Sequence, residues 1–429
     1  MREFKFTNFA QGLNNVFRED RLQRNVLRGA NNVDLSSTGA VQRRRGYQQL
    51  IADTGFEELY ATERQLFMVA NNALYVTSSP SELSSLPTAL ISGLADGPYD
   101  FTAIDDRVFL SDGRDIYAVR ANKPERLEFG VRGPGGVGTL SAASEGGWYA
   151  GTYLVNVTFV TETGWESGTP ISQPITLTEG QGIRFTDLPV SSDPDTAQLR
   201  IYVSDANGEA LYARTTIPNG TSSYTLGYKR AGKRLTTILK DTLPGGTTIT
   251  NFAGRLWVAD GKAILISEPA NYALYDLNTG YLLMEDDVEN LCAVGQGVFA
   301  FTAQNVVFIG GDRVNNMTRR EICPYPAIPG TGTVVDGKNI DPERLSGRDV
   351  AVWWCSTGTM MVGLPDGSVQ RVRDGEVSVS DYEEGMVAEL EREGVRQLVS
   401  VLKNPKSDSS LAASDSVAVQ VYRNGIELS

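Results

Sequence analysis

The residue types that could perform acid–base chemistry in this chain are limited, because it contains no histidine. A Ser-His-Asp triad, a Cys-His pair and an imidazole metal ligand are therefore excluded, and proton transfer would fall to carboxylates, lysine or tyrosine. The densest carboxylate cluster is Glu285, Asp286, Asp287 and Glu289. Its spacing matches no calcium-binding loop and it lacks the glycine that such a loop requires, so we interpret it as solvated surface.

The three cysteines, Cys292, Cys323 and Cys355, lie about thirty residues apart and form no CxxC pair. Their odd number and wide spacing predict neither a disulfide framework nor a zinc site. We expect buried free thiols in a protein made in a reducing compartment. The sequence thus predicts no metal, no cofactor and no catalytic residue.

Basic residues are the strongest candidates for binding. The first 50 residues carry nine basic and four acidic side chains, a net charge of +5, which leaves −18 on the remaining 379 residues of a chain whose net charge is −13. Such an asymmetry predicts an arm that docks on nucleic acid or on an acidic protein, with solvated surface as the alternative. The candidate residues are Arg18, Arg21, Arg24, Arg28, Arg43, Arg44 and Arg45.

Two local patterns refine these candidates. If residues 43–45 are in a strand, Arg43 and Arg45 share one face and Arg44 takes the other. A second basic group, expected at a hairpin tip, is either a solvated loop or a contact to a neighbouring subunit or another component. It consists of Lys229, Arg230, Lys233 and Arg234.

The elements that must position these residues are short strands. Five segments share a strand–turn–strand pattern, and their Asp-Gly or Asn-rich turns accept the positive φ of a two-residue hairpin turn. Each segment is expected to form the inner hairpin of a small antiparallel sheet. The segments are 66–76, 107–119, 255–266, 297–309 and 360–372, with turns at Asn71-Asn72, Asp112-Gly113, Asp260-Gly261, Ala303–Asn305 and Asp366-Gly367.

Recurrence of such sheets every 40–50 residues or so is typical of a β-propeller, whereas a β-sandwich or a set of unrelated β domains is the alternative. Residues 147–244 differ, because about seven short strands in roughly 100 residues favour a fibronectin-III/Ig-like sandwich without the antibody cysteine pair. The predicted fold class is therefore all-β, an interrupted propeller of about six or seven blades with an inserted sandwich. The predicted order is an arm (1–50), a first propeller segment (51–145), the sandwich (146–246) and a second propeller segment (247–429).

Three further expectations concern single segments. The adjacent Trp353 and Trp354 lie in a strand-like run and are predicted to be core residues. Residues 383–402 fit either a helix or a hairpin, and we predict the hairpin because of Gly394 and the valine-rich second half. The N-terminus lacks the apolar region of a secretory signal and no apolar run is long enough to span a membrane, so we expect a protein folded in the cytoplasm without membrane insertion.

The N-terminal arm resembles the N-terminal signature of tail proteins of short-tailed bacteriophages, the family of propeller-built nozzle, tail-tube or packaged-DNA stabilisation proteins. The resemblance is specific over about forty residues, with a third basic residue, Arg45, added to the usual run, and the closing residues 421–426 are also similar to that family. It rests on Phe9, Gly12, Asn14, Asn15, Val16, Ala30, Asn32, Val33, Asp34, Leu35, Thr38, Gly39, Val41, Arg43, Arg44, Gly46 and Tyr47.

This resemblance implies a structural virion protein rather than an enzyme. It implies a ring, with six copies favoured over twelve, that extends the DNA channel below the portal and its adaptor, retains packaged DNA and conducts it during ejection. The implied partners are other copies of the chain, the adaptor and portal, a tail needle or fibres, and double-stranded DNA in transit without sequence specificity. The implied location is the virion tail, after assembly in the host cytoplasm.

Two rival functions remain open at the sequence level. A propeller enzyme acting on carbohydrate could use paired carboxylates at the propeller centre, although no pair stands out in the sequence. A receptor-binding or adhesin protein could use the loops of the sandwich, but a fold alone does not define a function.

Overall fold

The computed structural model describes residues 9, 12–23, 25–29, 33–36, 39–43, 46, 49–52, 55–169, 171–311, 314–341, 343–372, 377–379, 382–392, 395–405 and 416–423. Regular structure in these residues is β-strand, apart from four single turns of 3₁₀ helix. No helix among them is long and apolar enough to cross a membrane. The turns are η1 (Glu19–Arg21), η2 (Pro80–Glu82), η3 (Val314–Asn316) and η4 (Gly337–Asn339).

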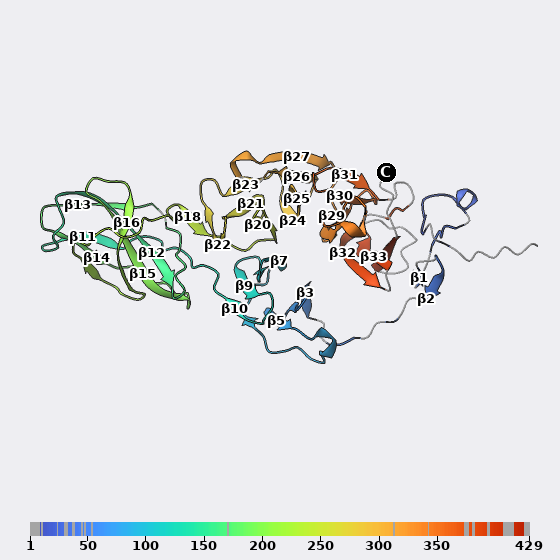
Figure 1. Cartoon of the computed structure of the whole chain (residues 1–429), viewed down its shortest axis with the longest axis horizontal. Coiled ribbons are helices and arrows are strands. Elements are labelled where there is room, and N and C mark those ends of the chain that lie inside the picture. Colours follow the sequence, from blue (N-terminus) through green and yellow to red (C-terminus); the bar gives the residue numbers. More distant parts are fainter. Residues whose placement is uncertain are drawn as a thin grey trace, which may run out of the picture.

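Six antiparallel sheets built mainly from consecutive strands form most of the body, and Figure 1 shows them following an arc. Sheet 1 contains β3 (Phe56–Ala61), β4 (Leu66–Ala70), β5 (Ala73–Thr77) and β6 (Ile91–Ser92), and sheet 2 contains β7 (Asp100–Ile104), β8 (Arg107–Ser111), β9 (Ile116–Arg120) and β10 (Arg126–Leu127). Sheet 3 contains β18 (Lys240–Thr242), β19 (Thr248–Phe252), β20 (Arg255–Asp260), β21 (Ala263–Glu268), β22 (Asn271–Asp276) and β23 (Tyr281–Leu283).

The second half of the body continues the succession. Sheet 4 contains β24 (Val288–Val294), β25 (Gly297–Thr302), β26 (Val306–Gly310) and β27 (Thr318–Cys323), and sheet 5 contains β28 (Thr333–Asp336), β29 (Asp349–Trp354), β30 (Met360–Gly363) and β31 (Val369–Arg371). Sheet 6 contains β32 (Tyr382–Arg392), β33 (Val395–Pro405) and β34 (Ser416–Arg423), so the hairpin predicted over 383–402 is confirmed. The all-β class is confirmed, and the succession of sheets is consistent with a propeller-like fold.

Apolar cores join each of these sheets to the next. On β8, Val108 and Leu110 pack into the core shared with sheet 1, whereas Phe109 packs into the core shared with sheet 3. On β29, Trp353 packs toward sheet 4 and Trp354 toward sheet 6, which confirms both as core residues. Successive side chains of a strand point to opposite faces, so a strand buried on both faces needs a continuous apolar run.

The joining pattern is sequential. Five cores connect sheet 1 to sheet 2 and so on to sheet 6, and no apolar core among the described residues joins sheet 6 back to sheet 1. The predicted number of blades therefore stays a prediction.

A cavity of about 1020 Å³ lies on the inner side of the arc, lined by residues of β7, β19, β24 and β28 together with Tyr60 of β3. The innermost strands are thus β7, β24 and β28, the first strands of sheets 2, 4 and 5, together with β19, which is the second strand of sheet 3 in chain order. The expectation that these segments form the inner hairpins of their sheets is confirmed for 66–76, 107–119, 255–266 and 297–309, which supply interior strands, whereas 360–372 supplies the last two strands of sheet 5. The strands that face the cavity carry more polar side chains and therefore give a weaker apolar signal in the sequence.

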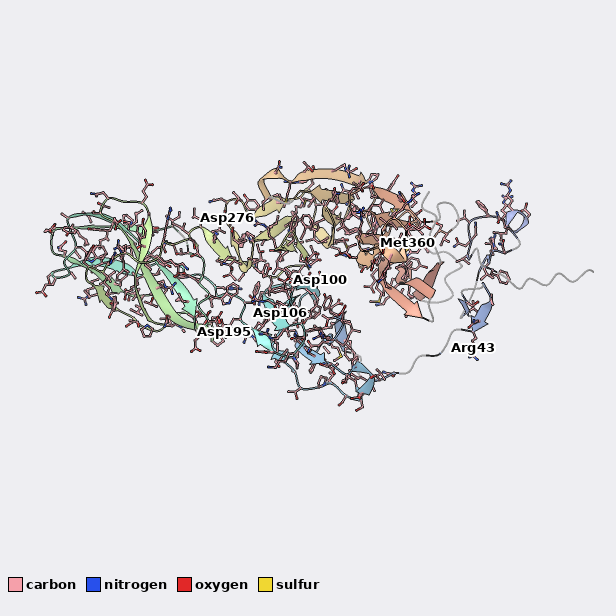
Figure 2. All side chains as sticks on the ribbon, viewed as in Figure 1. Arg43, Asp100, Asp106, Asp195, Asp276 and Met360 are labelled. Atoms are coloured by element: carbon pink, nitrogen blue, oxygen red, sulfur yellow. The ribbon has the colours of Figure 1, made fainter. Side chains whose placement is uncertain are left out.

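Polar bonds also join neighbouring strands at the cavity. Asp100 on β7, labelled in Figure 2, accepts hydrogen bonds through Oδ2 from the Thr248 hydroxyl (2.6 Å) and the Ile249 amide (2.8 Å) of β19. In return, the Asn251 side chain of β19 donates to the Ala103 carbonyl of β7 (2.8 Å). These bonds hold sheets 2 and 3 together at the edge of the cavity.

The predicted turns differ in detail. Asn71 and Asn72 form a two-residue turn with φ of 51° and 56°, as predicted, between the paired Ala70 and Ala73. By contrast, Asp260 belongs to β20 and pairs with Ala263, so the two turn residues there follow it.

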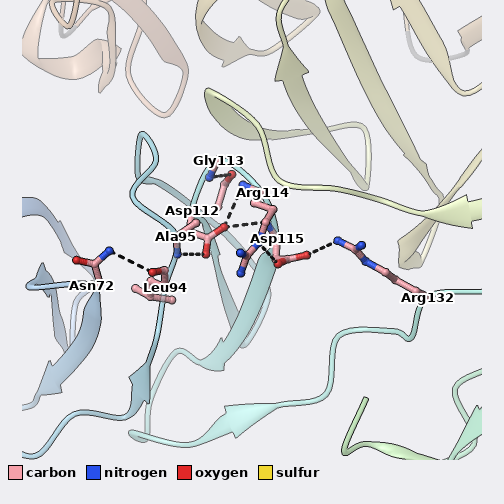
Figure 3. Close-up of polar contacts among 9 residues, drawn as sticks. Asn72, Leu94, Ala95, Asp112, Gly113, Arg114, Asp115 and Arg132 are labelled. Atoms are coloured by element: carbon pink, nitrogen blue, oxygen red, sulfur yellow. Dashed lines mark hydrogen bonds and ion pairs between the residues drawn. The ribbon is translucent and has the colours of Figure 1, made fainter. Parts of the chain in front are cut away.

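The Asp112-Gly113 turn is longer than predicted, because β8 and β9 are joined by the four residues 112–115. The buried Asp112 carboxylate stabilises this loop, as Figure 3 shows. It accepts hydrogen bonds from the amides of Arg114 (3.0 Å) and Asp115 (2.7 Å), and from the Ala95 amide (2.8 Å) of the segment before β7. The aspartate therefore acts through its side chain rather than through a positive φ.

Two sheets lie between sheets 2 and 3 in chain order and face one another across a single core that includes Trp148, Phe159 and Phe185. Arg126 of sheet 2 forms an ion pair with Asp195 of this two-sheet unit (3.0 Å). One sheet contains β11 (Thr139–Ala143), β14 (Gly182–Thr186) and β17 (Tyr224–Leu226), and the other contains β12 (Gly151–Thr161), β13 (Gln173–Leu177), β15 (Thr196–Ser204) and β16 (Leu211–Pro218). β11 precedes residue 146, the predicted start of this module, yet it pairs with β14.

Asp100→Ala is expected to lower the free energy of unfolding by about 1–3 kcal/mol, because the Ile249 amide and the Thr248 hydroxyl lose their acceptor. Urea denaturation followed by tryptophan fluorescence measures the loss. The matched control is Asp106→Ala, which removes a half-exposed carboxylate paired with Arg120 (2.8 Å) and should cost less than about 1 kcal/mol. Equal losses in the two variants would contradict this role.

The same comparison has a predicted pH dependence. Burial raises the pKa of Asp100 from 3.8 to about 6, so between these values the folded protein binds more protons than the unfolded chain. This group's contribution to stability is then greatest below pH 4 and is lost as the pH rises through 6. We expect the difference between wild type and Asp100→Ala to be about 1 kcal/mol larger at pH 5 than at pH 7.

Candidate functional site

The candidate arginines of the N-terminal arm are exposed wherever their side chains are described. Arg18 precedes η1 and Arg21 ends it, Arg28 follows the first loop of the arm, and Arg43 ends β2. Figure 2 shows Arg43 at the end of the molecule, away from the arc of sheets. Arg24, Arg44 and Arg45 lie outside the described residues, so the predicted alternation of faces over 43–45 stays a prediction.

The loop of the arm is organised by Asn14. Its side-chain oxygen accepts hydrogen bonds from the amides of Val16 (3.2 Å) and Phe17 (3.0 Å). Arg28 donates to the Phe17 carbonyl (2.6 Å) and thereby brings the two ends of the loop together. Arg28, one of the candidate basic residues, therefore also stabilises the fold of the arm itself.

A hairpin follows this loop. β1 (Val33–Leu35) pairs antiparallel with β2 (Val41–Arg43), and the Ser36 hydroxyl accepts from the Ala40 amide (3.0 Å) in the turn between them. Gly39 has a φ of 80° there, a backbone conformation that favours glycine.

The arm is anchored on the far end of the chain. Asn15 donates through Nδ2 to the Ser378 carbonyl (2.7 Å) and accepts through Oδ1 from the Ser378 amide (3.0 Å). One amide side chain therefore satisfies both backbone groups of a residue that lies just before sheet 6. This pair of bonds connects residues 363 positions apart in the sequence.

The second basic group was expected at a hairpin tip, but the structure describes these residues and shows no hairpin there. Its segment runs beside β16, where the Ala213 amide donates to the Lys233 carbonyl (2.9 Å) and Tyr212 forms a bridge with Arg234. The cause is that β16 offers free backbone groups on this side, since its other side pairs with β15. The four basic side chains are exposed, and within the described residues none of them forms an ion pair.

Two exposed tyrosines lie at the start of this basic segment and were not singled out from the sequence. Tyr149 is 64% exposed and Tyr228 is 52% exposed, and their ring centroids are 6.2 Å apart. Tyr228 also contacts the buried Trp148 ring (5.4 Å). Only the packing of two distant segments brings these rings together, so no local sequence pattern could have shown them as a pair.

Carboxylates at the cavity were not singled out from the sequence. Asp100 and Asp349 line the cavity, and Glu58 lies near Asp100 without being part of the lining. Burial raises the pKa of Glu58 to about 7, and the charge of the nearby Asp100 adds to this shift. Both oxygens of Asp100 already accept hydrogen bonds, because Oδ1 accepts from the Phe101 amide (2.8 Å). Because both of its oxygens are hydrogen-bonded within the protein, the Asp100 carboxylate joins neighbouring strands and is poorly suited to exchange protons with a substrate. In the described residues no three Cys, Asp or Glu side chains are grouped to share a metal ion.

No known protein family matches the sequence, and no curated protein is significantly similar to it. Solved structures give distant likenesses. AztD from Citrobacter koseri aligns with a TM-score of 0.35 and 12% identity over 86% of this chain and 90% of that one. The WD40 domain of Pan2 from Neurospora crassa aligns with a TM-score of 0.30 and 10% identity over 80% and 85%. PorZ from Porphyromonas gingivalis aligns with a TM-score of 0.22 and 12% identity over 90% and 57%. The chain is thus distantly similar to β-propeller proteins. Because these TM-scores are low, we describe the architecture from the pairing of the strands alone.

Asn15→Ala is expected to release the arm from its anchor, because two hydrogen bonds of about 1 kcal/mol each are lost. Limited trypsin digestion should then cleave after Arg18 and Arg21 roughly tenfold faster. Asn25→Ala, in the same arm, is the control and should leave the rate unchanged. Equal cleavage of Asn15→Ala and wild type would show that the anchor does not hold the arm.

Proposed function

We propose that this protein is a structural component of a bacteriophage tail, a nozzle-type protein that extends the DNA channel below the portal and its adaptor. The observation that carries the proposal is the arm, whose sequence resembles that of short-tailed phage tail proteins over residues 9–47. Its exposed arginines stand at one end of the molecule and Asn15 anchors it beside sheet 6. An anchored, cationic extension of this kind suits docking on the acidic surface of an adaptor.

The charge distribution supports a role as a DNA conduit. A wall that conducts double-stranded DNA must not retain it, and each cationic contact with a phosphate adds affinity through counterion release. The body outside the first 50 residues carries −18, so it repels the phosphates. In this proposal the basic arm grips the adaptor, and the acidic body conducts the packaged DNA and retains it until ejection.

We further propose that the six sheets are blades of an interrupted propeller and that the two-sheet unit is an inserted fibronectin-III-like sandwich. The five cores between successive sheets support the propeller, because its blades pack face to face in sequence. The single core between the two sheets that include β12 and β14 supports the sandwich.

The same proposal assigns the chain to a ring, for which we favour six copies. The exposed cations Lys229, Arg230, Lys233 and Arg234 then contact the acidic body of the neighbouring copy. The ring forms in the host cytoplasm on the portal–adaptor complex and becomes a component of the virion tail.

Reconstitution tests this function. The purified chain is expected to be monomeric alone and to assemble as a ring when mixed with the portal–adaptor complex, as seen by electron microscopy and sedimentation. Reversing two charges of the arm, Arg18→Glu with Arg21→Glu, should weaken assembly about tenfold at low salt.

The control pair is Arg64→Glu with Arg184→Glu, which changes the net charge equally at two exposed positions outside the arm. It should leave assembly unchanged. A stable, free dimer with no affinity for the adaptor, or absence of the chain from virions, would refute the proposal.

One observation favours a second candidate, binding to an acidic polysaccharide of the host surface. Tyr149 and Tyr228 offer exposed rings, and Lys229 directly follows Tyr228 in the chain. Aromatic rings combined with cations are suited to charged sugars. Affinity electrophoresis in an acidic polysaccharide gel should retard the wild type and should retard Tyr149→Ala less. Tyr281→Ala, at a tyrosine 40% exposed outside the two-sheet unit, is the control and should migrate like wild type. No retardation of the wild type would exclude this candidate.

A further inference from the structure

Two of the three free cysteines lie together between sheets 4 and 5. Cys323 ends β27 and Cys355 directly follows β29. All three cysteines belong to the core that joins these sheets, Cys292 from β24. The chain positions them through main-chain bonds between segments 326–328 and 354–356, since the Ile328 amide donates to the Trp354 carbonyl (2.8 Å) and the Ser356 amide donates to the Pro326 carbonyl (3.0 Å).

The side chains of Cys323 and Cys355 interact with each other in this core. The Cys323 thiol donates a hydrogen bond to the Cys355 sulfur, which also accepts from the Thr357 hydroxyl (3.2 Å). The bond from Cys323 is the main cause that lowers the pKa of Cys355, and the same bond raises the pKa of Cys323. These opposite shifts favour the thiolate form at Cys355 and the thiol form at Cys323, which is the division of roles that thiol–disulfide exchange uses.

Both cysteines are buried but lie directly beneath the surface. Their exposed fractions are 4% for Cys323 and 2% for Cys355. The neighbouring Tyr325 is 53% exposed, and Thr357 in the turn after Cys355 is also exposed. Each cysteine therefore lies within two residues of an exposed side chain.

Cys292 offers an internal comparison. It lies in β24 at the wall of the central cavity, and burial raises the pKa of its thiol. The Cys292 thiol therefore stays protonated. It serves as a comparison within the same molecule, because a buried thiol of this kind is unreactive in thiol–disulfide exchange.

We propose that Cys323 and Cys355 form a redox-active dithiol site, which a low-molecular-weight disulfide oxidises to a disulfide bond that joins sheet 4 to sheet 5. The Cys355 thiolate attacks one sulfur of the small disulfide and expels one small thiolate, which gives a mixed disulfide. Cys323 then loses its proton to solvent, its thiolate attacks the Cys355 sulfur, and the second small thiolate leaves. Two protein thiols and one small disulfide thus become one protein disulfide and two small thiols.

The biological setting of this reaction rests on the proposed function. A virion component assembles in a reducing cytoplasm, where thiols persist, and meets oxidising conditions once the particle is released. The bond would then form after assembly and would fix two neighbouring sheets to each other. The chemistry itself is tested on the purified chain, so failure of the tail assignment leaves it standing.

The experiment treats the folded full-length chain with excess oxidised glutathione, quenches with acid, alkylates the remaining thiols and maps the peptides without reduction. The expected result is the loss of two thiols, a single peptide pair joined through Cys323 and Cys355, and an alkylated Cys292. The oxidised chain should also unfold at a higher urea concentration than the reduced chain, because the bond constrains the unfolded state.

Three variants assign the roles. Cys292→Ser should react like wild type and is the matched control. Cys323→Ser should stop at a glutathione adduct on Cys355, whereas Cys355→Ser should leave both remaining thiols reduced. Far-ultraviolet circular dichroism reports whether each variant is folded, and peptide mapping of the wild type decides the question without any variant.

Three results would overturn the proposal. One is a disulfide that includes Cys292. Another is a glutathione adduct that persists in the wild type. The third is retention of all three thiols over a time in which the urea-unfolded chain becomes fully oxidised.

Discussion

The structure depends on strands that bury side chains on both faces. In β8 and β29, alternate residues enter two different cores, so each sheet is held by the sheet before it and the sheet after it. A shift of one residue in the register of such a strand would exchange its two sets of side chains. The order of the six sheets is therefore specified by side-chain packing rather than by the connecting loops.

This packing decides where polar residues can lie. The central strands of the sheets carry mainly apolar side chains, whereas β7, β19, β24 and β28 face the cavity and carry groups such as Asp100 and Asn290. Asn290 of β24 donates to the Gly332 carbonyl (2.7 Å) just before β28, so sheets 4 and 5 are bonded at the cavity much as sheets 2 and 3 are. Asp100 and Asn290 thus have a structural use at the cavity.

Much of this fold follows from local sequence. The apolar runs with Asn-rich or Asp-Gly turns predicted the β4–β5 and β8–β9 hairpins, because short-range turn chemistry and side-chain alternation suffice to define a hairpin. The four-residue loop at Asp112 was missed, since its carboxylate also bonds the Ala95 amide, which is seventeen positions away. The path of residues 229–234 was missed for a similar reason, because the free edge of β16 attracts it.

By itself, the sequence determined the β class, the hairpins, the burial of Trp353 and Trp354, the exclusion of imidazole chemistry and the separation of a basic arm from an acidic body. These properties depend on composition and on neighbours within a few residues. Only the tertiary structure decided that Asn15 bonds to Ser378, that Tyr149 contacts Tyr228 and that the Cys323 thiol meets the Cys355 sulfur. Such contacts join segments that are distant in the chain, and it is the stacking of successive sheets through shared cores that brings them together.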